Sequence, residues 1–295
     1  MNMLRILAPL LFVLSALSED GPDYSQVELK AHKVNGSVYM IAGTDDANHF
    51  SGGNIAVSVG EDGILMIDAK MAPLADKIMA VLAKLTGKEL EKSYPKFVLN
   101  THVHGDHVHG NSAFQDHGHV ISHENVRSRL EKTQPEDQWP TVTFNDRMTF
   151  FFNGETIAAS HYSKGHTDGD VMVSFREAKV LHMGDHFFSG LFPYVDLKNG
   201  GSVEGYIQNV KNVLDWIDES IQIIPGHGPL STKKDLQEFH AMLTGTRDLI
   251  LADMKAGLSL EELKAKGLPE SYAKWSWNFI TTPIWIETVF KSYSK

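Results

Sequence analysis

Four side chains able to bind a metal ion fall within six residues, 102–107. His102 and His104 stand two positions apart, so on an extended segment both point the same way and can reach one ion. Asp106 and His107 follow a glycine that allows a bend, and they can turn toward a second ion. This spacing differs from the helical His-Glu-x-x-His arrangement, in which residues four apart share one face.

Three further candidates each follow an apolar, strand-like segment: His166, Asp185 and His227. Loops after strands carry functional residues on a rigid scaffold, and the glycines beside all three allow tight turns. The set offers five imidazoles and two carboxylates, enough for the paired divalent cations of many hydrolytic enzymes. The predicted metal ligands are His102, His104, Asp106, His107, His166, Asp185 and His227, with Asp106 and Asp185 as the predicted catalytic carboxylates.

Composition narrows the classes of protein and partner. The chain has 295 residues, 42% of them hydrophobic, enough to build the core of a large domain. It has no cysteine, which excludes disulfides and thiolate zinc sites. A net charge of −10 without a basic patch argues against nucleic acid. The predicted partner is a small-molecule substrate, and the sequence does not indicate an oligomeric state.

The N-terminus has the pattern of an export signal. Arg5 is followed by an apolar run, 6–14, and then by small residues over 15–18. The apolar run is short for a membrane span. We therefore expect residues 1–18 to be a signal peptide and the mature chain to be periplasmic or secreted, without membrane association after cleavage. An uncleaved anchor or a simple N-terminal helix is the alternative.

The first half of the chain has the pattern of two hairpins, a helix and a strand. Asn35-Gly36, a favoured tight-turn pair, separates two segments of β character. Leucine and isoleucine at 74, 78, 82 and 85 recur at helical spacing. A short apolar strand then ends at the histidine run. The expected strands are 27–32, 37–42, 54–59, 63–68 and 96–100.

The second half repeats this order. Asn153-Gly154 is its first turn pair, and Ser202 is expected to cap a helix with one apolar face. A final strand ends just before His227. The repeat predicts two halves packed sheet to sheet with helices outside. The expected strands are 147–152, 155–160, 170–175, 179–183 and 221–224.

From residue 231 onward the pattern is helical and carries no motif. Thr232 with Asp235, and Ser259 with Glu262, fit helix caps. We expect a main domain over 24–230 and a helical extension, 231–295, packed on the same domain. Aromatic residues of the tail either pack it onto the core, which is the favoured interpretation, or line a substrate pocket. They are Trp275, Trp277, Phe279 and Trp285.

The order of these motifs resembles the metallo-beta-lactamase superfamily. The run His-Val-His-Gly-Asp-His is followed by Gly-His166-Thr, Gly-Asp185 and Gly-His227-Gly, and Asp68 precedes them all. The resemblance spans about 37 to 228 and implies an α/β, four-layer αβ/βα sandwich with metals at one edge. Implied roles are a first zinc on His102, His104 and His166, a second on Asp106, His107 and His227, a bridge by Asp185, and support by Asp68.

The residue at the bridging position, Asp185, narrows the choice among branches of the family. The best-known β-lactamase subclasses have Cys or Ser where this chain has Asp185, which looks more like glyoxalase II and lactonases. Some exported relatives with this His/Asp set also show β-lactamase activity. The leading expectation is an exported enzyme with two zinc ions, cleaving a lactam, lactone or related amide, ester or thioester by a metal-bridged hydroxide.

Other readings of the same motifs remain open. A persulfide dioxygenase would use a single iron at the equivalents of His102, His166 and Asp185. A glyoxalase II-like thioester hydrolase is weakened because the tail lacks a basic cluster for glutathione. A flavodiiron oxidoreductase would carry an acid at position 104. A non-catalytic metal-binding module would bind metal without turnover.

Three nearby features have two interpretations each. His186 either donates to a developing oxyanion or makes a structural hydrogen bond. His109 is either functional or packs at a helix start. The loop 43–54, with Asp45, Asp46, His49, Gly52 and Gly53, is either a mobile flap over the site or an ordinary connection.

Overall fold

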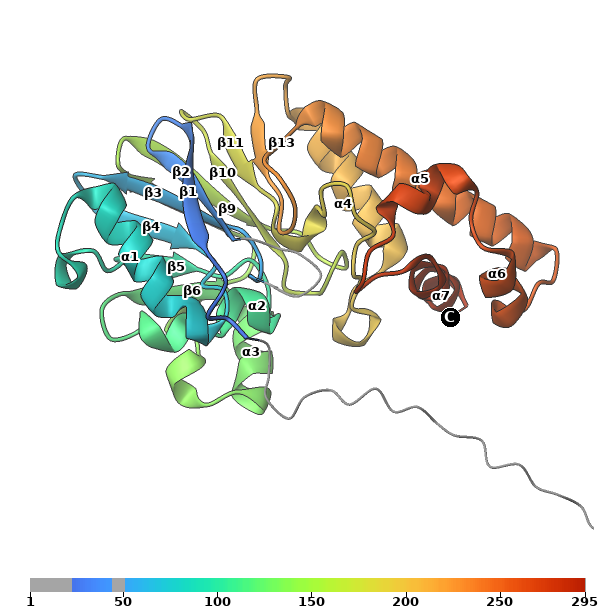
Figure 1. Ribbon diagram of the computed structural model, residues 1–295, viewed down its shortest axis with the longest axis horizontal. Helices are drawn as coiled ribbons and strands as arrows, with labels where there is room; N and C mark the ends of the chain where they lie inside the picture. The colour runs from blue at the N-terminus through green and yellow to red at the C-terminus, as the bar shows by residue number, and fades with distance from the viewer. Residues whose placement is uncertain (1–22, 44–50, 295) are drawn as a thin grey trace, which may run out of the picture.

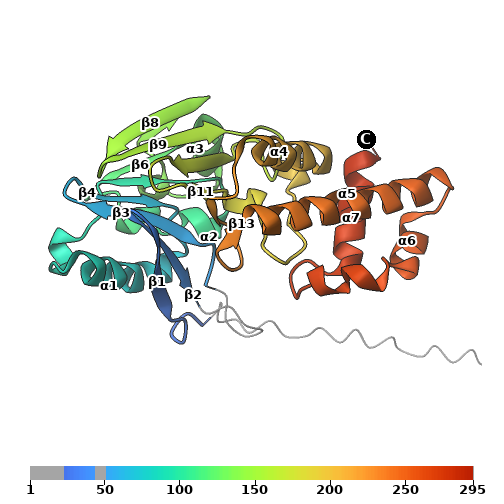
Figure 2. The same cartoon turned by 90° about the horizontal axis from the view of Figure 1, so that it is seen from above.

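Two mixed β-sheets lie face to face in the computed structural model, which describes residues 23–43 and 51–294 (Figures 1 and 2). The first sheet has the strand order β1-β2-β3-β4-β5-β6-β7 and the second the order β13-β12-β11-β10-β9-β8. The first comprises β1 Leu29–Asn35, β2 Val38–Gly43, β3 Ile55–Gly60, β4 Gly63–Ile67, β5 Phe97–Leu99, β6 His119–His123 and β7 Val142–Phe144. The second comprises β8 Arg147–Phe152, β9 Glu155–His161, β10 Val171–Phe175, β11 Val180–His182, β12 Gln222–Ile224 and β13 Ser231–Thr232.

Helices cover the outer faces of both sheets and continue beyond the second one (Figure 2). They form the outer layers of the four-layer sandwich that the sequence predicts. The α-helices are α1 Ala75–Thr86, α2 Gly105–Val108, α3 Glu124–Thr133, α4 Val203–Trp216, α5 Lys233–Lys255, α6 Leu260–Lys266 and α7 Thr282–Tyr293. The 3-10 helices are η1 Ala72–Leu74, η2 Leu90–Lys92, η3 Asn111–Ala113, η4 Glu136–Gln138, η5 Gly184–His186, η6 Leu197–Asn199 and η7 Glu270–Trp275.

The order that the sequence predicts for each half, hairpins followed by a helix and a strand, is confirmed in both sheets. Asn35 pairs with Val38 across the first hairpin, where Gly36 takes a φ of 49° that suits glycine. In the first half α1 connects β4 to the parallel β5. In the second half α4 connects β11 to the parallel β12. Ser202 caps α4 by accepting a hydrogen bond from the Gly205 N–H.

One crossover was missed by the sequence analysis. The strand β6 is followed by α3 and then by β7, and the two strands extend the first sheet in parallel. The hydrophobic pattern is weak here because α3 buries only Val126 and Leu130. Periodicity in such a polar helix is too faint to predict the element.

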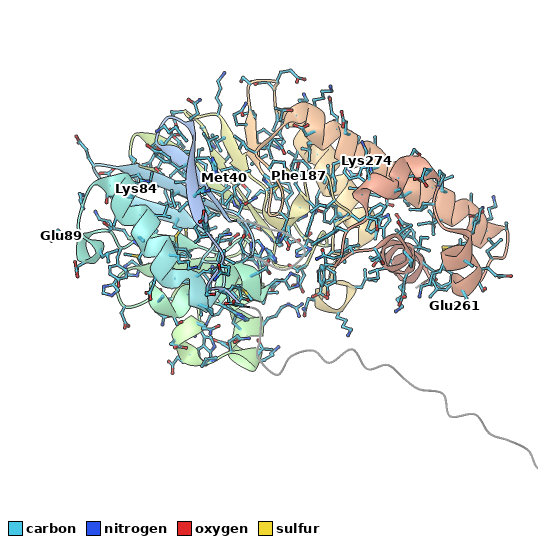
Figure 3. All side chains as sticks on the ribbon, viewed as in Figure 1. Met40, Lys84, Glu89, Phe187, Glu261 and Lys274 are labelled. Carbon is cyan, nitrogen blue, oxygen red and sulfur yellow. The ribbon has the colours of Figure 1, made fainter. Side chains whose placement is uncertain are left out.

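The space between the sheets holds an apolar core. Ile67 and Leu99 of the first sheet belong to the same buried cluster as Val173 and Ile224 of the second. A separate cluster packs α1 against the outer face of the first sheet. Figure 3 shows the side chains of Met40 and Phe187, which are buried, and of Lys84, which is exposed. This packing fixes the strand ends that carry the predicted ligands.

The C-terminal helices share a core cluster with the second sheet. The cluster joins Leu181 of β11 and Val210 of α4 to Phe239 of α5 and Trp285 of α7. The predicted caps are confirmed, because both Thr232 and Ser259 take part in reciprocal capping boxes, in α5 and α6. The division at residue 230 stays a prediction.

The predicted signal peptide, 1–18, and residues 44–50 of the predicted flap lie outside the described residues. Across 23–43 and 51–294, no helix combines the length and the apolar character that a membrane crossing requires.

Replacing Trp285 tests how firmly the C-terminal helices are attached. Trp285 is fully buried and its Nε1–H donates to Thr246 Oγ1 at 2.9 Å. We expect Trp285→Ala to lower the free energy of unfolding by about 3–5 kcal/mol, because it leaves a large cavity. Urea unfolding followed by circular dichroism measures this. Ile284→Ala, at an exposed neighbouring position, is the control. Equal stability of the two variants would show that the helices are loosely attached.

Candidate metal centre

The predicted ligands meet at one edge of the sandwich. His102 and His104 follow β5, and Asp106 and His107 lie on α2. The other three come from the second sheet. His166 precedes β10, Asp185 lies within η5 after β11, and His227 follows β12. Hydrogen bonds join the two sheets at this edge. The Val171 N–H donates to Thr101 O at 2.7 Å, and the Asn54 N–H donates to Gly226 O at 2.7 Å.

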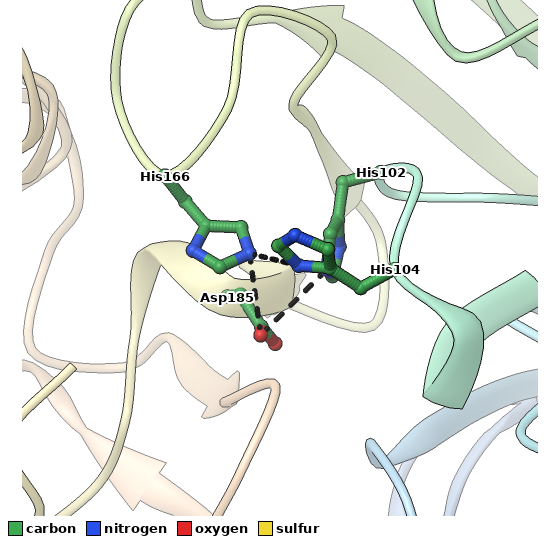
Figure 4. Close-up of side chains that lie close together, drawn as sticks. All are labelled: His102, His104, His166 and Asp185. Carbon is green, nitrogen blue, oxygen red and sulfur yellow. Dashed lines mark hydrogen bonds and ion pairs between the residues drawn. The ribbon is translucent and has the colours of Figure 1, made fainter. Parts of the chain in front are cut away.

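Four of the side chains form a first cluster. Each of His102, His104, His166 and Asp185 offers one ligand atom, and these atoms all lie within 4.8 Å of one another (Figure 4). Asp185 Oδ2 lies 3.6 Å from His102 Nε2 and 3.5 Å from His166 Nε2. His166 Nε2 lies 2.8 Å from His104 Nδ1. The four side chains surround one small space.

The other three form a second cluster, which Asp185 joins through its other oxygen. Asp106 Oδ2 lies 3.4 Å from His107 Nε2 and 3.3 Å from His227 Nε2. Asp185 Oδ1 lies 3.1 Å from His107 Nε2 and 3.5 Å from His227 Nε2. One carboxylate therefore presents Oδ2 to the first cluster and Oδ1 to the second, which is the geometry of a bridging ligand.

Hydrogen-bond accounting shows that the first cluster fits a cation. His166 Nδ1 donates to Tyr194 O at 2.7 Å, so its Nε2 carries a lone pair. His104 Nε2 donates to Asp196 Oδ2 at 3.0 Å, so its Nδ1 also carries a lone pair. These two lone pairs face each other at 2.8 Å. A shared cation satisfies both.

Buried atoms that make no hydrogen bond extend this argument to both clusters. Among the described residues, His102 Nε2, His107 Nε2 and Asp185 Oδ1 are buried and make no hydrogen bond. Buried polar atoms are rarely left in that state. Tetrahedral zinc binds nitrogen and oxygen ligand atoms at about 2.0–2.1 Å. Two such ligand atoms therefore lie about 3.3 Å from each other, close to the separations found here. The residues present fit a metal ion in each cluster.

Asp68, the supporting acid implied by the family resemblance, lies directly behind the second cluster. Its Oδ2 accepts from His107 Nδ1 at 2.7 Å and from Thr101 Oγ1 at 2.8 Å, and its Oδ1 accepts from the Thr101 N–H at 2.7 Å. The bond to His107 fixes the tautomer that directs Nε2 toward Asp185. Asp68 therefore orients a ligand through its hydrogen bonds.

The sequence analysis missed three groups that hold the ligands, or the segment beside them, in place. Asp196 holds His104 from 92 residues away, and the carbonyl of Tyr194 holds His166. The fully buried Lys70 donates from Nζ to the carbonyl oxygens of residues 51, 52 and 53. A Cβ on Gly53 would lie 2.1 Å from the His107 ring, so this segment must approach the site closely. No local pattern marks these contacts, because each joins distant segments.

The two clusters differ in charge when no metal is bound. Burial lowers the pKa of His102 and lowers that of His166 to about 3, so both rings are neutral at pH 7. Burial also opposes protonation of His227, but Asp185 and Asp106 outweigh it and raise its pKa to about 9. The same carboxylates raise the pKa of His107 against the effect of burial. The second cluster therefore carries protons that a metal must displace.

His186 lies behind the ligands. Its Nε2 accepts from Asn209 Nδ2 at 3.1 Å, its Nδ1 lies 3.7 Å from Asp170 Oδ2, and its ring stacks on Tyr206. Burial lowers the pKa of His186 to about 3. The structure favours the structural interpretation of this residue. His109 is half-buried at the C-terminal end of α2 and belongs to neither cluster.

The sequence profile of the metallo-beta-lactamase superfamily matches residues 50–227. The chain belongs to this superfamily. The matched part contains all seven predicted ligands and stops before α5, so the C-terminal helices lie beyond it.

Curated relatives of this chain carry related names. A lactamase-like protein, nscB, of Trichophyton rubrum is 26% identical over 79% of this chain and 72% of its own length. A metallo-beta-lactamase type 2 of Elizabethkingia meningoseptica is 24% identical over 72% of this chain and 84% of its own length. A metallo-beta-lactamase type 2 of a Bacillus species is 22% identical over 60% and 70%.

Solved structures confirm the fold. A metallo-beta-lactamase from Pontibacter korlensis matches with a TM-score of 0.62 at 17% identity, covering 74% of this chain and 99% of its own. The DIM-1 metallo-beta-lactamase matches with a TM-score of 0.61 at 17% identity, covering 74% and 98%. With the superfamily and the two His/Asp clusters established, the site is that of a metal-dependent hydrolase.

Removing the charge of Asp68 tests its supporting role. We expect Asp68→Asn to weaken metal binding at the second cluster by about 10- to 100-fold, because the neutral amide keeps one acceptor oxygen for three donors and His107 loses the charged acceptor that orients it. Competition with a chromogenic chelator measures both affinities. Asp116→Asn, at an exposed position outside the clusters, is the control. An unchanged second affinity in Asp68→Asn would contradict this role.

Proton release should distinguish the two clusters. At pH 7 His227, with a pKa of about 9, and His107 are protonated in the metal-free chain, whereas His102 and His166 are not. Binding of the second zinc should therefore release about two protons more than binding of the first. The affinity of the second cluster for zinc should rise with pH up to about 9. Calorimetry in two buffers of different ionisation enthalpy counts these protons, and equal release in both steps would refute the assignment.

Proposed function

We propose that this protein is an exported dizinc hydrolase that opens a cyclic amide or ester, a lactam or a lactone, with related esters and thioesters as further substrates. The observation that carries the proposal is the position of Asp185, whose two oxygens face separate clusters of ligands. Export rests on the signal pattern of residues 1–18. The names of the curated relatives support a lactam-like substrate class.

The residues of the site suit hydrolysis by an activated water. Held by the two clusters, zinc ions would supply a bound water with a pKa of about 7 and would polarise a carbonyl group. Asp185 keeps the two clusters at a fixed separation. Burial favours the neutral form of Asp106, but the charges of His107 and His227 outweigh it and hold the pKa of Asp106 well below its usual range. Its ionised carboxylate can accept a hydrogen bond from the attacking water and orient it.

No side-chain nucleophile is needed for this reaction. The chain has no cysteine, and the hydroxyl group of Thr101, the residue before His102, donates to Asp68 Oδ2. A carbonyl carbon placed beside Asp106 and Asp185 would be attacked by water directly. That single-step attack suits amides, esters and thioesters alike, so the choice among them depends on the surroundings of the clusters.

The second cluster is the reason to prefer two zinc ions to one iron. A persulfide dioxygenase would need only the equivalents of His102, His166 and Asp185. Here Asp106, His107 and His227 form a complete further ligand set, with the buried His107 Nε2 left without a hydrogen bond. Imidazole and carboxylate ligands accept both zinc and iron, so the presence of two ligand sets, rather than the ligand type, supports a pair of zinc ions. Glyoxalase II-like thioester hydrolysis is the nearest alternative within the same chemistry.

Removing the bridging carboxylate tests the mechanism. We expect Asp185→Ala to lower kcat/KM by about a thousandfold or more, because the transition state loses several kcal/mol of stabilisation from the paired ions. A panel of lactams, lactones and thioesters provides the assay, and circular dichroism checks the fold. His32→Ala, on the exposed edge strand β1, is the control. Full activity in Asp185→Ala would refute the proposal.

Metal content separates the two leading hypotheses. We expect mass spectrometry of the protein, purified without added metal, to find about two zinc ions per chain. One iron per chain, with oxygen consumption on a persulfide, would replace the hydrolase by the dioxygenase.

A further inference from the structure

Two of the seven candidate ligands have side chains that reach the solvent. The side chains of His104 and Asp106 are 21% and 17% exposed, whereas those of the other five ligands are buried. A substrate can therefore reach the clusters past these two residues. Whatever side chains stand beside them will contact the parts of the substrate that do not react.

A row of aromatic rings begins beside His104. Its members Tyr194, Trp277 and Phe279 are partly or largely exposed, whereas Phe188 is buried. The ring of Tyr194 lies 5.4 Å from that of His104, and Phe279 lies 5.7 Å from Tyr194. Trp277 is 5.5 Å from Phe279 and 6.3 Å from Phe188. Phe188 in turn stacks on the ligand His227 at 4.9 Å. We call Phe188, Tyr194, Trp277 and Phe279 the aromatic row; it runs from one cluster to the other.

Half of the row comes from the C-terminal helices, beyond the part of the chain that matches the superfamily. The segment between η7 and α7 carries Trp277 and Phe279. Trp277 Nε1–H donates to Phe192 O at 2.9 Å, and the Phe192 N–H donates to Trp275 O at 2.7 Å. These bonds fasten the segment to the loop that also carries Tyr194.

Core packing does not account for the whole row. Trp275 and Trp285 of the tail are buried, as the packing interpretation predicts. Phe279 is 56% exposed, although it touches both Tyr194 and Trp277. A large exposed aromatic side chain continuous with other aromatic rings, beside a reactive site, has the character of a binding surface.

We propose that the aromatic row binds an aromatic substituent of the substrate, so that the C-terminal segment sets substrate preference. The inference rests on the proposed hydrolase function for the reaction that follows binding. No member of the row is charged, and aromatic rings pair favourably with one another in offset or edge-to-face geometry. The row therefore favours aryl-bearing lactones and lactams over small aliphatic ones.

The test compares γ-phenyl-γ-butyrolactone with unsubstituted γ-butyrolactone. We expect Phe279→Ala to lower the aryl-over-unsubstituted ratio of kcat/KM about five- to tenfold, through KM, because one aromatic contact is lost. The loss should fall mainly on the phenyl lactone, because the unsubstituted lactone has no ring that could contact Phe279. Phe279→Leu keeps an apolar side chain and should give a smaller loss.

The matched control is Phe151→Ala. Phe151 is 82% exposed on β8, beside the hairpin turn at the sheet end opposite the ligand-bearing loops. The Phe151→Ala substitution removes an equally large exposed ring elsewhere on the surface. We expect it to leave both lactones unaffected. An equal loss of the aryl preference in Phe151→Ala and Phe279→Ala would overturn the inference.

Binding without turnover separates this inference from the proposed function. Calorimetry with phenylacetate and acetate on the zinc-loaded protein should show a preference for phenylacetate that Phe279→Ala reduces. If Phe279→Ala reduces this preference while the protein hydrolyses no lactone, lactam or thioester, the hydrolase proposal is refuted and the binding role of the aromatic row is supported. If lactones are hydrolysed but neither the aryl preference nor phenylacetate binding depends on Phe279, the row is refuted and the hydrolase stands.

Discussion

The rest of the site depends on the placement of one carboxylate between two groups of imidazoles. Asp185 comes from the second sheet, whereas His102 and His107 come from the first. The two clusters can share it only if the sheets pack in one register at this edge. The apolar core between the sheets and the hydrogen bonds at the ligand-bearing edge impose that register. The metal centre is therefore a product of sheet packing.

Buried polar contacts then hold each ligand in position. Asp68 and Lys70 are both fully buried, which is costly unless every polar atom finds a partner. Asp68 satisfies His107 and Thr101, and Lys70 satisfies three carbonyl groups of the segment beside His107. These networks orient the imidazoles before a metal arrives. A preorganised ligand set of this kind loses little freedom on binding.

The C-terminal helices have two physical roles in this structure. Trp285 and Phe239 complete a core with the second sheet. The same helices bring Trp277 and Phe279 close to the metal centre. The seven candidate ligands thus come from the part that matches the superfamily, whereas two of the aromatic side chains near them, Trp277 and Phe279, come from outside it. Such a division lets substrate preference change while the ligand set is retained.

The sequence by itself determined the features with local causes. The histidine run, the turn at Asn35-Gly36 and the helix caps at Ser202 and Thr232 each depend on neighbouring residues, and the ligand types alone indicated metal. Tertiary structure decided the rest. It paired His104 with Asp196, 92 residues away, and separated buried Trp285 from exposed Phe279. Contacts between distant segments depend on how the sheets and helices pack, and no short stretch of sequence encodes that packing.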